Sequence, residues 1–180
     1  MPPTVAIIGA GPLGRRLALS AARVGFRVLL EDVMPVNLHH AQEFLRQELS
    51  PAALPAVAFV STIEDAVRDA DLAIDCVPDE LESKLEILWL LDRMAPPRTV
   101  LVTPTTRLSI ADLASCTYRP EKCVAIAVEA SALAANASEI LPLRVTAKTT
   151  PETIALVADF WRQLGFIPAF APDPAEQPIA

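Results

Sequence analysis

Three glycines near the start of the chain have the spacing of a phosphate-holding turn. Gly9, Gly11 and Gly14 form a GxGxxG segment with Pro12 and Leu13, and they are three of only five glycines in 180 residues. The first glycine of such a segment allows a tight turn, the second lets the backbone approach a pyrophosphate, and the third lets helix and strand pack closely. A helix that begins here would direct free N–H groups and its positive dipole end at the phosphates.

A carboxylate follows at the distance that a dinucleotide site requires. Asp32 lies eighteen residues after Gly14, at the end of the next apolar run. A carboxylate there accepts hydrogen bonds from an adenosine ribose and repels a 2′-phosphate, and no Lys or Arg occurs in residues 33–38. The pattern therefore predicts NAD rather than NADP as ligand. A glycine turn that binds no ligand is the alternative, which the strand–turn–helix context disfavours.

Apolar runs alternate with helical periods along the whole chain. This alternation predicts an α/β fold, a Rossmann-type doubly wound and mostly parallel sheet, in a single domain over residues 1–180 with 173–180 as a tail. The expected strands cover residues 5–10, 27–31, 57–60, 72–77, 99–103, 123–128, 140–146 and 167–170. The expected helices cover residues 12–24, 37–49, 61–70, 79–94, a short segment after Ser109, and 151–164, with Ser61, Ser109 and Thr150 as caps.

Composition excludes several classes of partner. The net charge of −7 comes from 15 basic and 22 acidic residues without a basic patch, so neither nucleic acid nor an anionic membrane surface is expected as a partner. No apolar run is long enough for a membrane span, and residues 1–4 lack the features of a signal peptide. Three cysteines without metal-ligand spacing predict free thiols, a cytoplasmic location and no metal site.

Taken together, these segments resemble the NAD-binding domain of the 3-hydroxyacyl-CoA dehydrogenases of fatty acid β-oxidation. The likeness runs from Val5 to about Asp173 and is carried by residues 5–14, 25–32, 70–79, 95–97, 108–113, 119–121, 150–153 and 164–165. The resemblance implies NAD as the cofactor, Asp79 as an acidic residue near it, and Lys84 as a lysine near the pyrophosphate or ribose. The residues themselves also allow Asp79 to be a helix N-cap and Lys84 to be solvated on a helix.

The catalytic segments depart from this family. Pro104-Thr105-Thr106-Arg107 stands where the family has Asn-Thr-Ser-Ser, so Thr106 keeps a hydroxyl donor whereas Pro104 supplies no amide. Ala127-Val-Glu-Ala-Ser131 replaces the family's His-Phe-Phe-Asn-Pro, so the position of the catalytic base holds a methyl group and Ala130 lacks the amide. Since general acid–base catalysis contributes about 10²–10⁴-fold, little turnover is expected.

Other titratable groups offer no convincing replacement for the base. Glu139 occupies the position of the glutamate that orients the family's histidine, but without that histidine we interpret it as a surface carboxylate at a strand edge. Glu129 would share a face with Ala127 on a continuing strand, which makes it a weaker candidate for a surrogate base. His39 and His40 lie on the wrong segment and are expected to face solvent.

The sequence therefore predicts a catalytically degenerate NAD(H)-binding domain of this family. An active NAD-dependent 3-hydroxyacyl-CoA dehydrogenase or related oxidoreductase is the alternative, and a structural protein without nucleotide is disfavoured by the intact cofactor signals. Neither the family's helical hairpin after the second strand nor its C-terminal helical domain has a counterpart in the sequence, so no pocket for a CoA thioester is expected.

One helix carries more apolar surface than a single sheet face needs. Residues Ile87–Leu91 are consecutively apolar, and they span more than the stripe of about 100° that faces a core. This run suggests a homodimer that buries Trp89 and its neighbours. A helix enclosed within its own domain is the alternative.

Overall fold

A single eight-stranded sheet organises the chain. The computed structural model describes residues 3–134 and 139–176, and its strand order is β3-β2-β1-β4-β5-β6-β7-β8. Neighbouring strands are parallel except for the antiparallel pair β6–β7. The strands are β1 (Thr4–Ile8), β2 (Arg27–Glu31), β3 (Val57–Val60), β4 (Leu72–Asp75), β5 (Val100–Pro104), β6 (Cys123–Ile126), β7 (Ile140–Val145) and β8 (Ile167–Pro172). The predicted Rossmann-type α/β fold is confirmed.

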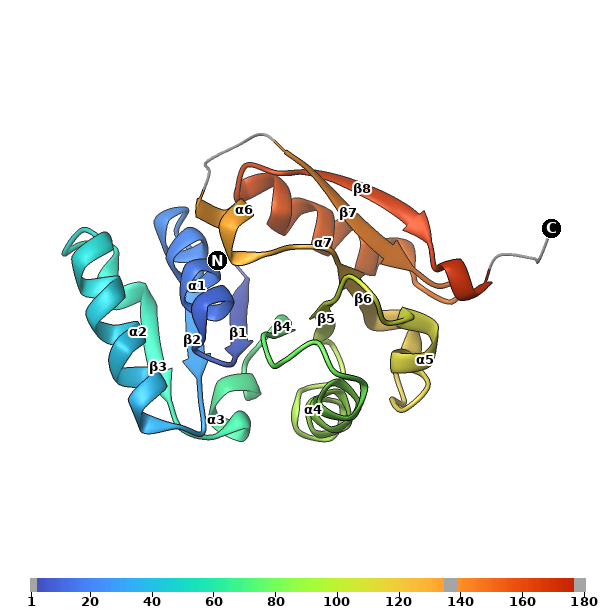
Figure 1. Cartoon of the computed structure of the whole chain (residues 1–180), viewed down its shortest axis with the longest axis horizontal. Helices are drawn as coiled ribbons and strands as arrows, with labels where there is room; N and C mark the ends of the chain where they lie inside the picture. Colours follow the sequence, from blue (N-terminus) through green and yellow to red (C-terminus); the bar gives the residue numbers. More distant parts are fainter. Residues whose placement is uncertain (1–2, 135–138, 177–180) are drawn as a thin grey trace.

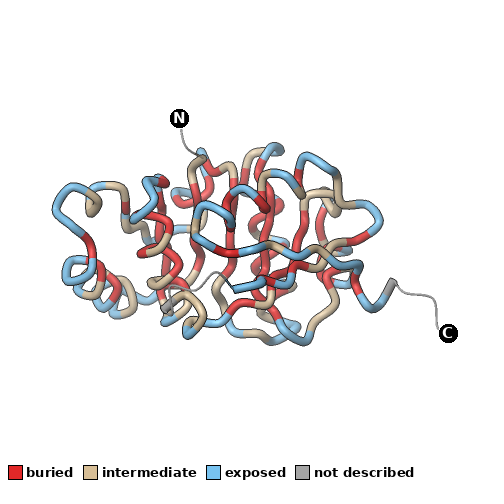
Figure 2. The backbone as a smooth tube through the Cα atoms, turned by 90° about the horizontal axis from the view of Figure 1, so that it is seen from above, coloured by how far each residue is buried: buried red, intermediate tan, exposed pale blue. Residues whose placement is uncertain are grey.

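Helices cover both faces of the sheet, which is why the inner strands are apolar on both sides (Figure 1). Side chains of α1, α2 and α7 join one core cluster, and those of α3, α4 and α5 join the other. The helices are α1 (Pro12–Arg23), α2 (Pro35–Glu48), α3 (Ile63–Val67), α4 (Leu81–Met94), α5 (Ile110–Ala114), α6 (Ala130–Ala134) and α7 (Pro151–Gln163). Figure 2 shows the buried residues concentrated along the strands and on the inner sides of the helices.

Most helix boundaries follow from their caps, with two corrections. The hydroxyls of Ser109 and Thr150 accept backbone N–H groups three residues later, as expected. The cap of α3, however, is Thr62 rather than Ser61, because its hydroxyl accepts from the N–H of Asp65. The N-cap of α4 is Glu80 rather than Asp79, and it makes no capping hydrogen bond through its side chain.

Between β2 and β3 the chain contains the single helix α2 and a short 3-10 turn at Leu54–Ala56. This arrangement confirms that no helical hairpin is inserted at this point. The helix α6, which immediately follows β6, was not expected from the sequence. Its small residues carry no clear helical pattern, and the predicted strand was two residues too long as a result.

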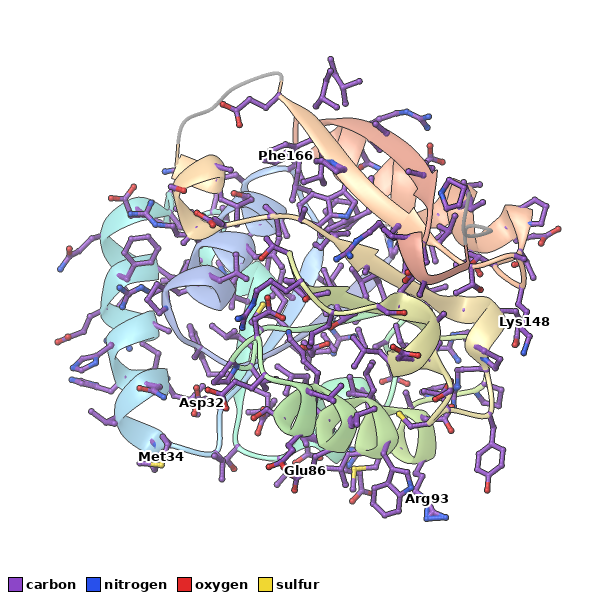
Figure 3. All side chains as sticks on the ribbon, turned by 45° about the vertical axis from the view of Figure 1, so that its right-hand side comes forward. Asp32, Met34, Glu86, Arg93, Lys148 and Phe166 are labelled. Carbon is purple, nitrogen blue, oxygen red and sulfur yellow. The ribbon has the colours of Figure 1, made fainter. Side chains whose placement is uncertain are left out.

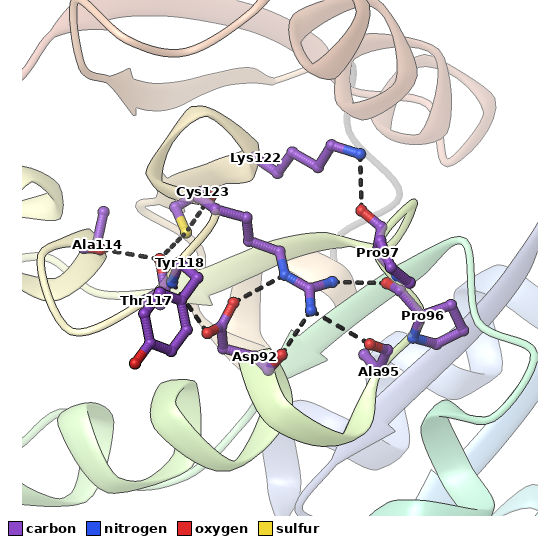
Figure 4. Close-up of polar contacts among 10 residues, drawn as sticks. Asp92, Ala95, Pro96, Pro97, Ala114, Thr117, Tyr118, Lys122 and Cys123 are labelled. Atoms are coloured by element: carbon purple, nitrogen blue, oxygen red, sulfur yellow. Dashed lines mark hydrogen bonds and ion pairs between the residues drawn. The ribbon is translucent and has the colours of Figure 1, made fainter.

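Arg119 ties the end of α4 to the segment before β6 (Figure 4). Its Nε donates to Asp92 Oδ1 at 2.8 Å, and its other nitrogens donate to the carbonyl oxygens of Asp92, Ala95 and Pro96. These carbonyls are at the end of the helix, where backbone acceptors have no partner within the helix. The arginine thus completes the hydrogen bonding of this helix terminus.

The ordered domain extends at least to Asp173, the first residue of the expected tail. Asp173 is fully buried, and its carboxylate accepts hydrogen bonds from the N–H groups of Ile110 and Ala111 at the start of α5. Residues 177–180 lie outside the described residues. Within the described part of the chain, no helix combines the length and apolar character that spanning a membrane requires.

Candidate nucleotide-binding site

The glycine segment forms a tight turn between β1 and α1. Gly9 has a φ of +103°, which favours glycine, and its N–H donates to the carbonyl oxygen of Glu31 at 2.8 Å. Gly14 lies directly against this turn, since a Cβ at Gly14 would be 1.8 Å from the carbonyl oxygen of Gly9. The first and third glycines therefore shape the junction of strand and helix, as the sequence predicted.

Gly11 has a different role because it faces open space. A Cβ at this position would meet no protein atom within 4 Å, and Gly11 lines the cleft. It is the N-cap of the twelve-residue helix α1, and no side chain caps the helix here. The N–H groups of Leu13 and Gly14 in the first turn thus have no partner within the helix and remain available to an anion. This geometry fits a pyrophosphate group.

Asp32 connects the glycine turn to the start of α2. Its Oδ2 accepts from the N–H of Ala10 at 2.9 Å and from the amide of Asn37 at 3.1 Å, and its Oδ1 accepts from the N–H of Met34 at 2.8 Å. Asp32 and Met34 lie together where β2 leads into α2 (Figure 3). A carboxylate has about four acceptor sites, so one remains on Oδ1 for a ribose hydroxyl.

A cleft of about 690 Å³ runs along the carboxyl ends of β1, β2, β4 and β5. Among the predicted site residues, Gly9, Gly11, Pro12, Leu13, Asp32, Asp79 and Thr106 line it, whereas Gly14, Lys84 and Glu139 do not. The other lining residues are Ile8, Glu31, Val33, Asn37, Ile63, Cys76, Val77, Pro78, Ile87, Pro104, Thr105, Val128 and Glu129. Ligands of α/β sheets bind at this edge of the sheet, next to the point where strand order reverses.

Asp79 links two of the loops that border the cleft. Its Oδ2 accepts from the N–H of Thr106 at 3.2 Å, and its carbonyl oxygen accepts from Arg107 at 2.8 Å. Its Oδ1 is buried, and no partner for it is found among residues 3–134 and 139–176. This free acceptor fits the predicted position near a cofactor, which stays a prediction, whereas the alternative of a helix N-cap is wrong.

Lys84 is neither solvated nor part of the cleft wall. Its side chain is 1% exposed, and its Nζ donates to Oδ1 of the fully buried Asp75 at 2.5 Å. Burial raises the pKa of Asp75, while the neighbouring Lys84 opposes this shift. The solvated position considered from the sequence is thus wrong. The signal for this ion pair was a single acid in an otherwise apolar strand, Leu72–Asp75.

The cleft lining includes residues 104–106 and 128–129, which belong to the two segments that depart from the family's catalytic segments. Thr106 is exposed there, next to the buried Thr105, whose hydroxyl accepts from the N–H groups of Arg107 and Leu108. Glu129 is exposed and lines the cleft, and its carbonyl accepts the first backbone bond of α6 from Ala132 at 3.1 Å. Glu139 is exposed beside β7, as expected of a surface carboxylate.

Glu31 is a cleft residue that sequence reasoning missed. It is the last residue of β2 and is only 4% exposed. Burial raises its pKa from 4.5 to about 7, and the neighbouring Asp32 adds to the shift. The apolar periodicity predicted Glu31 only as a strand residue, and a functional role was assigned to the adjacent Asp32 alone. His39 and His40, by contrast, are exposed on α2 as predicted.

The glycine turn, the uncapped helix end and the acid after β2 define a Rossmann-type dinucleotide-binding domain. Residues 4–173 match the sequence model of the family described as 3-hydroxyacyl-CoA dehydrogenase, NAD binding domain. The chain belongs to this family, and NAD is the cofactor that the domain binds.

Curated relatives of the chain are dehydrogenases of several kinds. It is 30% identical over 177 residues to the 5-formyl-3-hydroxy-2-methylpyridine 4-carboxylate 5-dehydrogenase of Mesorhizobium japonicum, covering 91% of this chain and 55% of that protein. It is 31% identical to the L-carnitine dehydrogenase of Burkholderia mallei, covering 92% and 53%. The chain thus spans about half the length of these relatives.

Solved structures agree with this assignment. A 3-hydroxyacyl-CoA dehydrogenase from Archaeoglobus fulgidus superposes with a TM-score of 0.81 at 25% identity, over 95% of this chain and 57% of that one. A diketoreductase superposes with a TM-score of 0.82 at 28% identity, over 95% and 65%. In each case the likeness leaves a substantial part of the other chain unmatched.

Proposed function

We propose that this domain binds NAD(H) and has lost most of the hydride-transfer activity of its family. The observation that carries the proposal is Ala127 at the position where the family has its catalytic histidine. Oxidation of a hydroxyl group by hydride transfer to NAD requires a base for the hydroxyl proton, and a methyl group accepts none. Pro104 and Ala130 support the same conclusion, since neither supplies the side-chain amide found at its position in the family.

An active oxidoreductase is the second candidate, and Glu129 favours it. Glu129 is exposed, and it lines the cleft together with Thr106. From the sequence, Glu129 is expected on the strand of Ala127, but β6 ends at Ile126 and Glu129 instead precedes α6. A base here would therefore act from the start of a helix, not from the face of a strand.

A rate measurement distinguishes the two candidates. Oxidation of NADH by acetoacetyl-CoA is followed at 340 nm in the parent protein, in Glu129→Gln and in Ala127→His. The proposal expects a negligible rate in the parent, no change in Glu129→Gln, and a higher rate in Ala127→His if only the base is missing. A robust parental rate that falls at least ~100-fold in Glu129→Gln would establish the second candidate.

A homodimer through α4 also remains a proposal. Of residues 87–91, Ile87, Leu88 and Leu91 are buried in the domain, and Trp89 is 46% exposed with Arg93 stacked 4.4 Å from its ring centroid. Within this run, a dimer would therefore use Trp89 and Leu90. Sedimentation of Trp89→Arg beside the parent tests it, and an unchanged oligomeric state removes the proposal.

We further propose the cytoplasm as the location. The three cysteines are free, and burial raises the pKa of the Cys123 thiol to about 12. Buried thiols with raised pKa values are unreactive, and they suit a reducing compartment. Fractionation of the native host with antibody detection would test this location.

A further inference from the structure

The cleft has an apolar slot next to the position expected for the ribose. Gly11 and α1 offer N–H groups to the phosphates, and Asp32 offers an acceptor to the sugar. The apolar residues Val33, Ile63, Val77 and Ile87 also line the cleft, and Ile63 and Val77 pack against the core cluster that contains Ile87. A flat base attached to a ribose at Asp32 would extend into this slot and cover its apolar walls.

Glu31 adds a polar group to this apolar slot. Side chains alternate along a strand, so Glu31 shares the sheet face of Leu29, whose core cluster includes residues of α3 and α4. Its direct neighbours in the sheet register are Ile8 on β1 and Val60 on β3. Glu31 is only 4% exposed, yet its carboxyl oxygens are not among the fully buried side-chain atoms that lack a partner in the described part of the chain. Because Glu31 also lines the cleft, its carboxyl group is accessible to a ligand that enters there.

The charges around Glu31 define what kind of ligand group it fits. Asp32 follows it directly, and its negative charge adds to the rise in the pKa of Glu31. On α3, Asp65 is paired with Arg68. On α4, the ammonium group of Lys84 is paired with Asp75. An anionic ligand group would therefore be repelled, whereas a neutral N–H donor would satisfy the carboxyl group. Since burial brings its pKa to about 7, both protonation states occur near neutral pH, and either one can accept a hydrogen bond.

We propose that Glu31 recognises the exocyclic amino group of adenine and thereby selects an adenine dinucleotide over one with a carbonyl group at that position. When protonated, the same carboxyl group also donates to a ring nitrogen beside the amino group, so that the carboxyl group and the base form two hydrogen bonds. This inference rests on the binding of NAD(H) in this cleft, and it identifies Glu31 as the residue that recognises the adenine base. A base with a carbonyl group at this position would leave Glu31 without the donor that it needs.

The test compares NADH with reduced nicotinamide hypoxanthine dinucleotide, which differs by a carbonyl group in place of the amino group. Both are titrated calorimetrically into the parent protein, Glu31→Gln, Glu31→Leu and the control Glu64→Gln, an exposed acid on α3 outside the cleft lining. We expect the parent and Glu64→Gln to prefer NADH by about 10-fold or more. Glu31→Leu should bring the two affinities within about 3-fold, and Glu31→Gln, which retains an acceptor oxygen, should lie between.

Each outcome decides a separate question. Equal affinities of the parent for the two dinucleotides would overturn the role of Glu31 while leaving NAD(H) binding intact, and so would an unchanged preference in Glu31→Leu. The parental comparison requires no substitution, so the inference can be tested even if Glu31→Leu does not fold. If the parent bound neither dinucleotide, nucleotide binding itself would be refuted.

Discussion

The Cα of Gly14 lies so close to the carbonyl oxygen of Gly9 that a Cβ at residue 14 would be 1.8 Å from that oxygen. Both groups belong to backbone, so neither can rotate away as a flexible side chain would. Because residue 14 has no Cβ, the first turn of α1 can pack directly against the glycine turn. It also separates the role of Gly14, which is packing, from that of Gly11, which faces the cleft.

Gly14→Ala should therefore destabilise the fold itself. We expect a loss of about 2 kcal/mol or more in the free energy of unfolding, since relief of the clash requires a shift of α1 against β1. Urea unfolding followed by circular dichroism measures this loss. Gly25→Ala is an informative contrast, because Gly25 has a φ of +91° but a Cβ added there would meet no atom within 4 Å. A stability of Gly14→Ala equal to that of the parent would contradict the packing role.

Lys84 and Asp75 provide a second stability test. Lys84→Met leaves Asp75 buried without its cation, which should cost about 3–5 kcal/mol at neutral pH. Because burial already raises the pKa of Asp75, protonation should relieve part of this cost, so the loss should be smaller at pH 5 than at pH 8.

The matched control for this pair is Arg98→Met. Arg98 forms an exposed ion pair with Asp71 at 3.1 Å, and exposed pairs contribute about 0–1 kcal/mol. Urea midpoints of both variants at the two pH values give the comparison. Equally small losses of unfolding free energy in Lys84→Met and Arg98→Met would show that the buried ion pair contributes no more to stability than the exposed one.

The raised pKa of Glu31 predicts a particular dependence of stability on pH. Between pH 4.5 and about 7 the folded protein holds a proton on Glu31 that the unfolded chain releases, so stability should fall as pH rises through this window and level off above it. The contribution should be about 1–3 kcal/mol across the window. Glu31→Gln should remove it. Urea unfolding between pH 4.5 and 8 gives the pH profile of stability for the parent and for Glu31→Gln. If the two profiles had the same slope throughout, the assignment of the raised pKa to Glu31 would be contradicted.

The fold and the phosphate end of the site could be predicted because their signals are local. The spacing of Gly9, Gly11 and Gly14 fixes a turn whose geometry depends on a few neighbouring residues, and apolar alternation fixes the parallel sheet. Helix ends were harder, since Ser61 and Thr62 both have the hydroxyl group that a cap requires, and the structure shows that Thr62 accepts from the N–H of Asp65.

The buried polar groups could not be predicted in the same way. Lys84 has the pattern of a helix surface residue, and only the approach of α4 to β4 pairs it with Asp75. Glu31 was likewise hidden by its position in a strand, because the sequence does not show which sheet face borders the cleft. Such long-range placements depend on the packing of several elements.

The most direct test of nucleotide binding uses Gly11, where an added Cβ would meet no protein atom within 4 Å. Calorimetric titration with NADH is performed on the parent and on Gly11→Val, with urea unfolding as the check on folding. We expect one NADH bound per parent chain, and a Gly11→Val protein of nearly parental stability whose affinity is at least about 100-fold weaker, because the side chain occupies the space of the pyrophosphate. Absence of NADH binding in the parent, or equal affinity in the two proteins, would contradict it.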